Sequence, residues 1–140
     1  MDNVPTPAPE TAEPSPPALP SQEDRLLAIL CHVGYVVLPI LLPLILFLVK
    51  KDSRFVKDNA RQALVFQALM GLAWFALMLV SAIASRLTMG LAGLAMLPLF
   101  GLLLLAGLIL SIVAILKAHA GEVYQYPLTS RLAEQYLGHL

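Results

Sequence analysis

Three long runs without a charged side chain are the feature that most restricts what this sequence can fold into. Residues 26–49 form the first run, residues 63–85 the second and residues 87–116 the third. A helix rises about 1.5 Å per residue, so about 20 apolar residues cross the ~30 Å hydrocarbon core of a bilayer. Each run is long enough to do this, and the sequence therefore predicts an all-α integral membrane protein.

The composition supports the same class and excludes others. Apolar residues make up 59% of the chain and charged residues 13%, whereas an ordinary soluble domain has about 45–50% and about 25%. A small soluble protein needs a larger polar surface than this chain supplies. Nine basic and nine acidic residues leave no net charge to attract a nucleic acid, and the single cysteine, Cys31, cannot form an internal disulfide. Soluble enzymes, nucleic-acid-binding proteins and disulfide scaffolds are thus excluded.

The chain divides into three regions. Residues 1–24 hold seven of the eleven prolines, several acids and no Lys or Arg, which predicts a disordered acidic tail because such a segment has too little apolar surface to fold. Residues 25–131 form the predicted helical membrane domain. Residues 132–140 form a C-terminal tail, in which Leu and Tyr recur at the spacing of a short amphipathic helix.

Prolines set the limits of the predicted transmembrane helices, which are residues 26–49, 63–85 and 97–116. Pro39 and Pro43 lie inside the first run, and each removes a backbone donor and clashes with the preceding turn. The first span is therefore either a crossing helix kinked by its prolines or a re-entrant hairpin, and we favour three full spans.

The ends of the other two helices follow from capping residues and from length. Asp52 or Ser53 is a suitable N-cap for a helix that begins before the membrane and continues into the second span. The third run would be ~45 Å long as a straight helix, more than one bilayer core needs. Because Pro98 suits the first turn of a helix, we expect the third span to begin at residue 97 and residues 87–96 to form an outer loop or an interfacial segment.

Basic residues orient the predicted spans. The segment 50–62 carries five Lys or Arg, the segment between the second and third spans carries Arg86 alone, and the C-terminal side carries Lys117 and Arg131. Cytoplasmic loops are enriched in Lys and Arg, so we expect the basic 50–62 loop and the C-terminus in the cytoplasm, under a bacterial inner (plasma) membrane. Three spans place the N-terminal tail outside, whereas a re-entrant hairpin places it inside.

Residues with catalytic potential are few. The sequence has no metal-ligand spacing, no phosphate-binding glycine loop and no carboxylate in the predicted spans. We therefore expect no enzyme activity, no cofactor and no metal. His32 is expected to be neutral at the interface and hydrogen-bonded to a carbonyl or to water, and Tyr124 and Tyr126 are expected to be interfacial anchors.

Two sets of residues are candidates for contacts. One is a basic surface that binds anionic headgroups or a partner, or that only sets the topology, and it comprises Lys50, Lys51, Arg54, Lys57 and Arg61. The other would pack helices closely, within the monomer or between copies, because small residues let helices approach and an amide can bond across the gap. It comprises Gln67, Gly71, Gly107 and Ser111.

Two stretches together suggest a family. One runs from Lys50 to Gln67, and the other runs from Lys117 to Thr129 and includes Tyr124 and Tyr126. With the first apolar run, they resemble a Tic-twenty-like family of small bacterial membrane proteins of unknown function, distantly similar to a component of the chloroplast inner-envelope import translocon. The resemblance covers about residues 26–131 and implies a compact helical membrane domain.

These observations lead to two hypotheses of function. The first is a small non-enzymatic membrane protein of unknown process, acting as a structural, accessory or interaction component. Its partners would be the lipid bilayer and either further copies of the chain or another membrane protein. The alternative is an oligomeric channel or translocation component, which the resemblance and the proline-broken first run both suggest.

Overall fold

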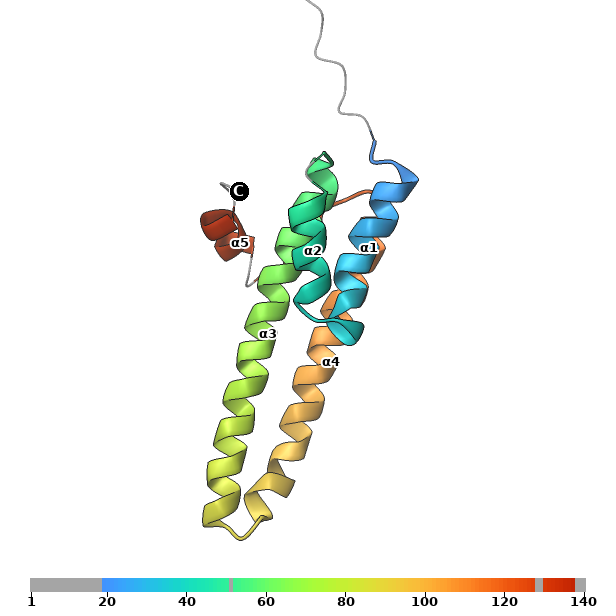
Figure 1. Ribbon diagram of the computed structural model, residues 1–140. Helices are drawn as coiled ribbons and strands as arrows, with labels where there is room; N and C mark the ends of the chain where they lie inside the picture. The colour runs from blue at the N-terminus through green and yellow to red at the C-terminus, as the bar shows by residue number, and fades with distance from the viewer. Residues whose placement is uncertain (1–18, 51, 128–129, 138–140) are drawn as a thin grey trace, which may run out of the picture.

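Helices account for most of the residues that the computed structural model describes, which are residues 19–50, 52–127 and 130–137. Two long antiparallel helices, α3 and α4, form a pair, and the shorter α1 and α2 lie along one half of this pair (Figure 1). The five helices of the described residues are α1 (Gln22–Val37), α2 (Leu41–Val49), α3 (Arg54–Leu87), α4 (Leu91–His119) and α5 (Ser130–Leu137).

The first apolar run turns back on itself. Helix α1 ends at Val37, Ile40 has a positive φ of 68°, and α2 then runs back beside α1 (Figure 1). Pro39 explains the break, because it has no N–H for a continuing helix and disfavours helical geometry at the residue before it. Leu38 accordingly has φ −142°. The run is therefore a re-entrant hairpin, and the favoured kinked crossing helix is wrong.

The expected number of three transmembrane helices is also not supported. Among the described residues, α3 with 34 residues and α4 with 29 are the two helices that are long and apolar enough to cross a membrane. With 16 and 9 residues, α1 and α2 extend only ~24 Å and ~14 Å. The second predicted span, residues 63–85, lies within α3.

Several helix termini lie at the same end of the α3–α4 pair. Lys50 at the end of α2 forms an ion pair with Glu23 at the start of α1, with 2.8 Å between Nζ and Oε1. Arg25 donates to the carbonyl of His119 at the end of α4, over 3.3 Å. The start of α1 therefore lies at the same end as the end of α4, and not at the opposite end as three spans would require.

The start of α3 agrees with the prediction from the sequence, and the start of α4 does not. Ser53 caps α3, since its hydroxyl accepts from the backbone N–H of Val56, as expected. Helix α4 begins at Leu91 and not at residue 97, because a tight turn through Gly90 (φ 98°) starts it at once and the Thr88 hydroxyl accepts from the first turn. Most of the expected outer loop is thus helical, and Pro98 lies inside α4.

Buried side chains concentrate in the half that the α1–α2 hairpin covers. Small residues on α1, α3 and α4 are fully buried there, including Ala28, Ala60, Ala63, Ala114 and Ala118. The other half of α3 and α4 presents large apolar side chains outward, among them Leu72, Phe75, Met78, Leu102 and Leu105. Lipid tails satisfy such a surface in a membrane, so the exposed apolar area is consistent with two crossing helices.

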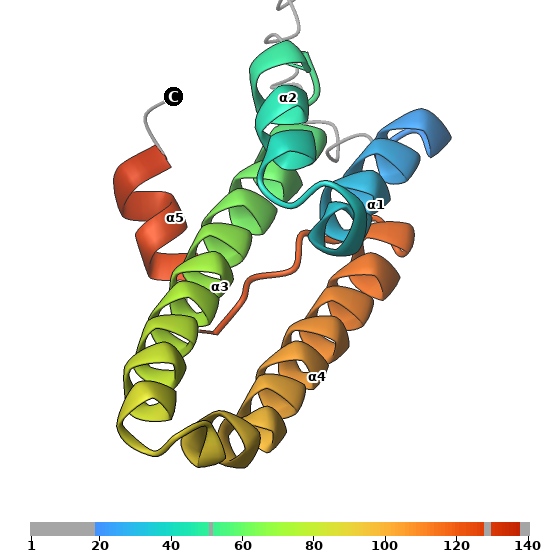
Figure 2. The same ribbon diagram turned by 60° about the horizontal axis from the view of Figure 1, so that its bottom comes forward.

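The chain after α4 returns to α3. Residues 120–127 cross from the end of α4 toward α3, as Figure 2 shows, and α5 then lies beside α3. At the other terminus, the Ser21 hydroxyl caps α1 by accepting from Asp24, so helix begins before the expected boundary at residue 24. The Pro-rich part of the expected tail, residues 1–18, lies outside the described residues.

Candidate functional site

A single amide holds the tip of the hairpin against α3. The Gln67 side chain is 2% exposed, and its Nε2 donates to the Cys31 carbonyl over 2.9 Å. Its Oε1 accepts from the backbone N–H of Ile40 over 2.7 Å. Backbone that leaves helical geometry at membrane depth is stable only where protein groups satisfy it. Gln67 provides this satisfaction for the turn between α1 and α2.

A second buried cluster joins α1, α3 and the segment after α4. The amide nitrogen of Asn59 donates to the Phe55 carbonyl over 3.0 Å, so its oxygen is the group that faces His32 Nε2 at 3.2 Å. His32 therefore carries its proton on Nε2 and accepts on Nδ1 from the Tyr126 hydroxyl, 3.0 Å away. The three side chains are at most 1% exposed, and the imidazole has both nitrogens bonded in its neutral form.

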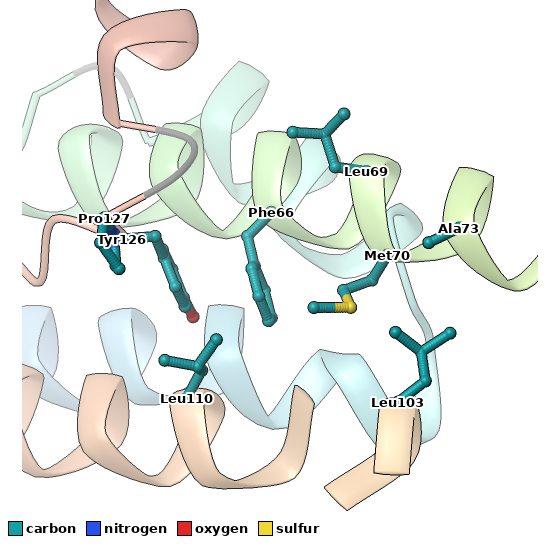
Figure 3. A pocket seen from close by; sticks show the side chains of 8 residues that line it. All are labelled: Phe66, Leu69, Met70, Ala73, Leu103, Leu110, Tyr126 and Pro127. Carbon is teal, nitrogen blue, oxygen red and sulfur yellow. The ribbon is translucent and has the colours of Figure 1, made fainter. Parts of the chain in front are cut away.

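Aromatic rings extend this cluster toward a cavity. Tyr126 stacks on Phe66 with 4.1 Å between ring centroids and 6° between ring planes, and Tyr124 meets Tyr126 edge-on at 4.9 Å. The stacked pair closes one end of an apolar cavity of 190 Å³ between α3 and α4 (Figure 3). Burial raises the pKa of the Tyr126 hydroxyl above its ordinary value, and the neighbouring Tyr124 adds to the rise. Tyr126 is thus a packed structural residue and not the expected interfacial anchor.

The predicted basic surface is largely paired within the chain. Lys50 bonds Glu23, and this hydrogen bond together with the charge of Glu23 raises the pKa of the Lys50 ammonium. Asp58 lies 3.3 Å from Arg61 and 3.9 Å from Arg54. These acids reduce the positive charge that the segment presents to an anionic partner.

Two other members of the basic set differ in their placement. The Lys57 ammonium lies over the Phe47 ring, 5.5 Å from its centroid, a cation–π arrangement that attaches α2 to α3. Lys51 lies outside the described residues. Arg54 has the most exposed charged group of the pairs, since its side chain is 96% exposed.

The four residues predicted to pack helices have different environments. Gln67 is buried as described above, and Ser111 is buried beside the Tyr126 hydroxyl. Gly107 lies directly against the Tyr35 hydroxyl, so any side chain there would collide with α1. Gly71 is exposed, and an added Cβ would meet no atom within 4 Å. Close helix approach at Gly71 is therefore not seen.

The hydrogen-bond partners within these clusters were not predicted from the sequence. Asn59 and Tyr126 are the partners of His32, although a backbone carbonyl or water was expected. The sequence separation of 94 residues between His32 and Tyr126 leaves no local signal for this pairing. No group of three or more His, Cys, Asp or Glu that could hold a metal occurs in the part of the chain that the structure describes.

The fold and the buried polar contacts define a class: an all-α protein in which a helical hairpin is fixed on two helices that are long and apolar enough to cross a membrane. Within this class, the chain belongs to the magnetosome magnetite crystal formation protein family (MamF_MmsF), whose model matches residues 23–133. No curated protein and no solved structure matches the chain. The resemblance to a Tic-twenty-like family is wrong, because the matching model describes a different family. The expectation of an unknown process is wrong as well, because the description of this family names magnetite crystal formation.

Proposed function

We propose that this chain is a non-enzymatic accessory protein of magnetite crystal formation and that it resides in the magnetosome membrane. The observation that carries the proposal is the family match over residues 23–133, which includes α1 from its second residue and all of α2 to α4. The match supports a location in the membrane around a growing crystal, whereas the plasma membrane was expected from the sequence.

The use of polar groups within the fold supports an accessory role. The amide oxygen and nitrogen of Gln67 and both ring nitrogens of His32 are hydrogen-bonded inside the protein, so these buried groups serve the fold. The surfaces left to act on other molecules are the apolar faces of α3 and α4 and the charged helix ends. Such surfaces suit contacts with lipid, with further copies or with other membrane proteins.

Sidedness follows from the basic residues once the hairpin is included. Lys50, Arg54, Lys57 and Arg61 lie near the start of α3, and the turn from α3 to α4 carries Arg86. By the rule that basic segments remain cytoplasmic, the start of α1 and the end of α4 face the cytoplasm. The α3–α4 turn then faces the lumen in which the crystal grows.

The channel alternative loses its support. It was based on the resemblance that the family match replaces and on the proline-broken run. That run is a hairpin with its turn bonded to Gln67.

Deletion of the gene from its own host, followed by electron microscopy of the crystals, tests the proposal. We expect crystals of altered size or number, restored by the wild-type gene. A Gln67→Leu gene should restore them poorly, because the hairpin loses its anchor, and the matched control Gln135→Leu, at an exposed position of α5, should restore them fully. A fluorescent fusion should co-localise with the crystals. Unchanged crystals after deletion, or a fusion spread evenly over the plasma membrane, would contradict the proposal.

A further inference from the structure

The hairpin leaves part of the membrane thickness uncovered on one side of the α3–α4 pair. Its turn lies about midway along these helices, and α3 and α4 continue well beyond it (Figure 1). A cavity of 500 Å³, here called the notch, lies at this turn. The notch is bounded by Pro39 and Ile40 of the turn, Gly71 and Trp74 of α3, and Leu104 and Leu108 of α4.

The notch has the size and chemistry of a binding site for an apolar chain. Ligand sites are typically ~300–1,000 Å³ and mostly apolar, and a dry apolar cavity of even ~150 Å³ binds benzene. Apart from Gln67 and Tyr35, its lining side chains are apolar, and the Gln67 amide is already bonded to the hairpin. The notch therefore offers little to a polar solute.

The distance from the notch to Arg86 matches one leaflet of a bilayer. Twelve residues of α3 separate Trp74 from Arg86, which corresponds to ~18 Å along the helix axis. Half of the hydrocarbon core is ~15 Å. An acyl chain whose headgroup lies at the level of Arg86 therefore ends near Trp74, where the turn of the hairpin blocks further extension.

Arg86 supplies a charge at the matching position. It is exposed, and it is the one charged residue between Ala63 and Leu116. The nearest acids in the sequence, Asp58 and Glu122, belong to the other end of the helix pair. Arg86 also lies only ~60° around α3 from Gly71. A lipid phosphate is the complementary group available at that depth.

We propose that the notch binds an acyl chain of an anionic phospholipid from the leaflet on the side of the α3–α4 turn, and that Arg86 holds the phosphate of this lipid. The lipid fills the space that the short hairpin leaves open and thereby supports its turn. The site lies at the end of the molecule opposite the basic segment that begins at Lys50, and it does not depend on the role in crystal formation.

Trp74 is the only tryptophan of the chain, and its place in the notch makes it a reporter. The full-length protein is reconstituted into phosphatidylcholine vesicles that contain increasing fractions of phosphatidylglycerol brominated in its acyl chains. We expect Trp74 fluorescence to be quenched in a saturable manner at low fractions of the brominated lipid. Brominated phosphatidylcholine should quench less at the same fractions.

Substitutions at two glycines provide a variant with a filled notch and a matched control. An added Cβ meets no atom within 4 Å at Gly71 or at Gly101, so neither substitution is obstructed, but only Gly71 lines the notch. Gly71→Leu should abolish the saturable part of the quenching, and Gly101→Leu should leave it unchanged. Leu104→Phe fills the notch from α4 and serves the same purpose if Gly71→Leu does not fold.

Arg86 is tested separately. Arg86→Gln should raise the half-saturating fraction of phosphatidylglycerol about fivefold, because one basic residue near an anionic surface contributes about that much to binding. Arg86→Lys should retain most of the affinity. Quenching that rises in proportion to brominated lipid, with no preference for phosphatidylglycerol, overturns the proposal. Quenching that Gly71→Leu does not change overturns it as well. Shielding of Trp74 from all brominated lipids, with cross-linking between copies at Gly71→Cys, would identify a second copy as the occupant.

Discussion

The side-chain oxygen of Gln67 lies 2.7 Å from the backbone nitrogen of Ile40, and this contact joins α3 to the turn of the re-entrant hairpin. Ile40 is held at a positive φ of 68°, which a β-branched residue rarely adopts. The same amide bonds Cys31 one turn and a half before the end of α1. One residue of α3 thus fixes both the end of α1 and the start of α2.

Replacement of Gln67 by leucine should destabilise the hairpin. The substitution keeps the side-chain volume similar but leaves the Ile40 N–H and the Cys31 carbonyl without their partner, and each unsatisfied buried group costs about 1–3 kcal/mol. We expect a loss of about 2 kcal/mol or more in the free energy of unfolding, measured by denaturation in mixed micelles. The matched control is Gln135→Leu on α5, where the side chain is exposed and no comparable loss is expected. Equal effects of the two changes would contradict this role of Gln67.

Tyr126→Phe should separate the hydroxyl of Tyr126 from its ring. The change removes the hydrogen bond to His32 and leaves the stack on Phe66, so the free energy of unfolding should fall by about 1 kcal/mol. Tyr126→Ala also removes the ring and should cost about 3–5 kcal/mol. The same unfolding measurement compares them. A Tyr126→Phe protein as unstable as Tyr126→Ala would show that the hydroxyl, and not the ring, holds the segment after α4.

High pH should destabilise the fold through the same residue. Burial raises the pKa of Tyr126, whereas tyrosine in an unfolded chain titrates near about 10. The contribution is complete below that value, and it is lost as the pH rises because the unfolded state loses its proton first. The stability of the wild type should therefore fall more steeply above about pH 10 than that of Tyr126→Phe. Absorbance of tyrosinate should show a late titration step in the wild type only, and an identical titration in both proteins would contradict the expected rise.

The sequence and the structure agree on features that are local. Apolar runs predict α3 and α4, and Ser53 marks the start of α3, because periodicity and capping depend on neighbouring residues. Pro39 predicts a break but not its geometry, since a proline is compatible with a kink and with a turn. The geometry depends on Gln67, 27 residues away from Ile40. A contact between distant segments of this kind leaves no periodic signal.

The candidate site illustrates the same limit. Gln67 was identified as a packing residue because its amide lies among small residues on one helix face, but its bonds to the hairpin turn were not foreseen. His32 was recognised as a neutral polar residue, but Asn59 and Tyr126 come from other helices and segments. The beginning of α4 was misplaced because Pro98 was treated as a first-turn residue, whereas the turn through Gly90 starts the helix at Leu91, six residues before the expected start.

Accessibility of introduced cysteines should distinguish the hairpin from a crossing helix. In the structure, Gln22 at the start of α1 and Ala120 at the end of α4 lie at one end, where Arg25 bonds the His119 carbonyl. Thr88 lies at the turn between α3 and α4. In a Cys31→Ala background, a membrane-impermeant thiol reagent should label Gln22→Cys and Ala120→Cys from the same side of sealed vesicles and Thr88→Cys from the other side.

Cys31 is buried, so the unsubstituted protein should label little and serves as the control. Labelling of Gln22→Cys together with Thr88→Cys would show that the first apolar run crosses the membrane. Labelling of all three positions from one side would mean that α3 and α4 do not cross it.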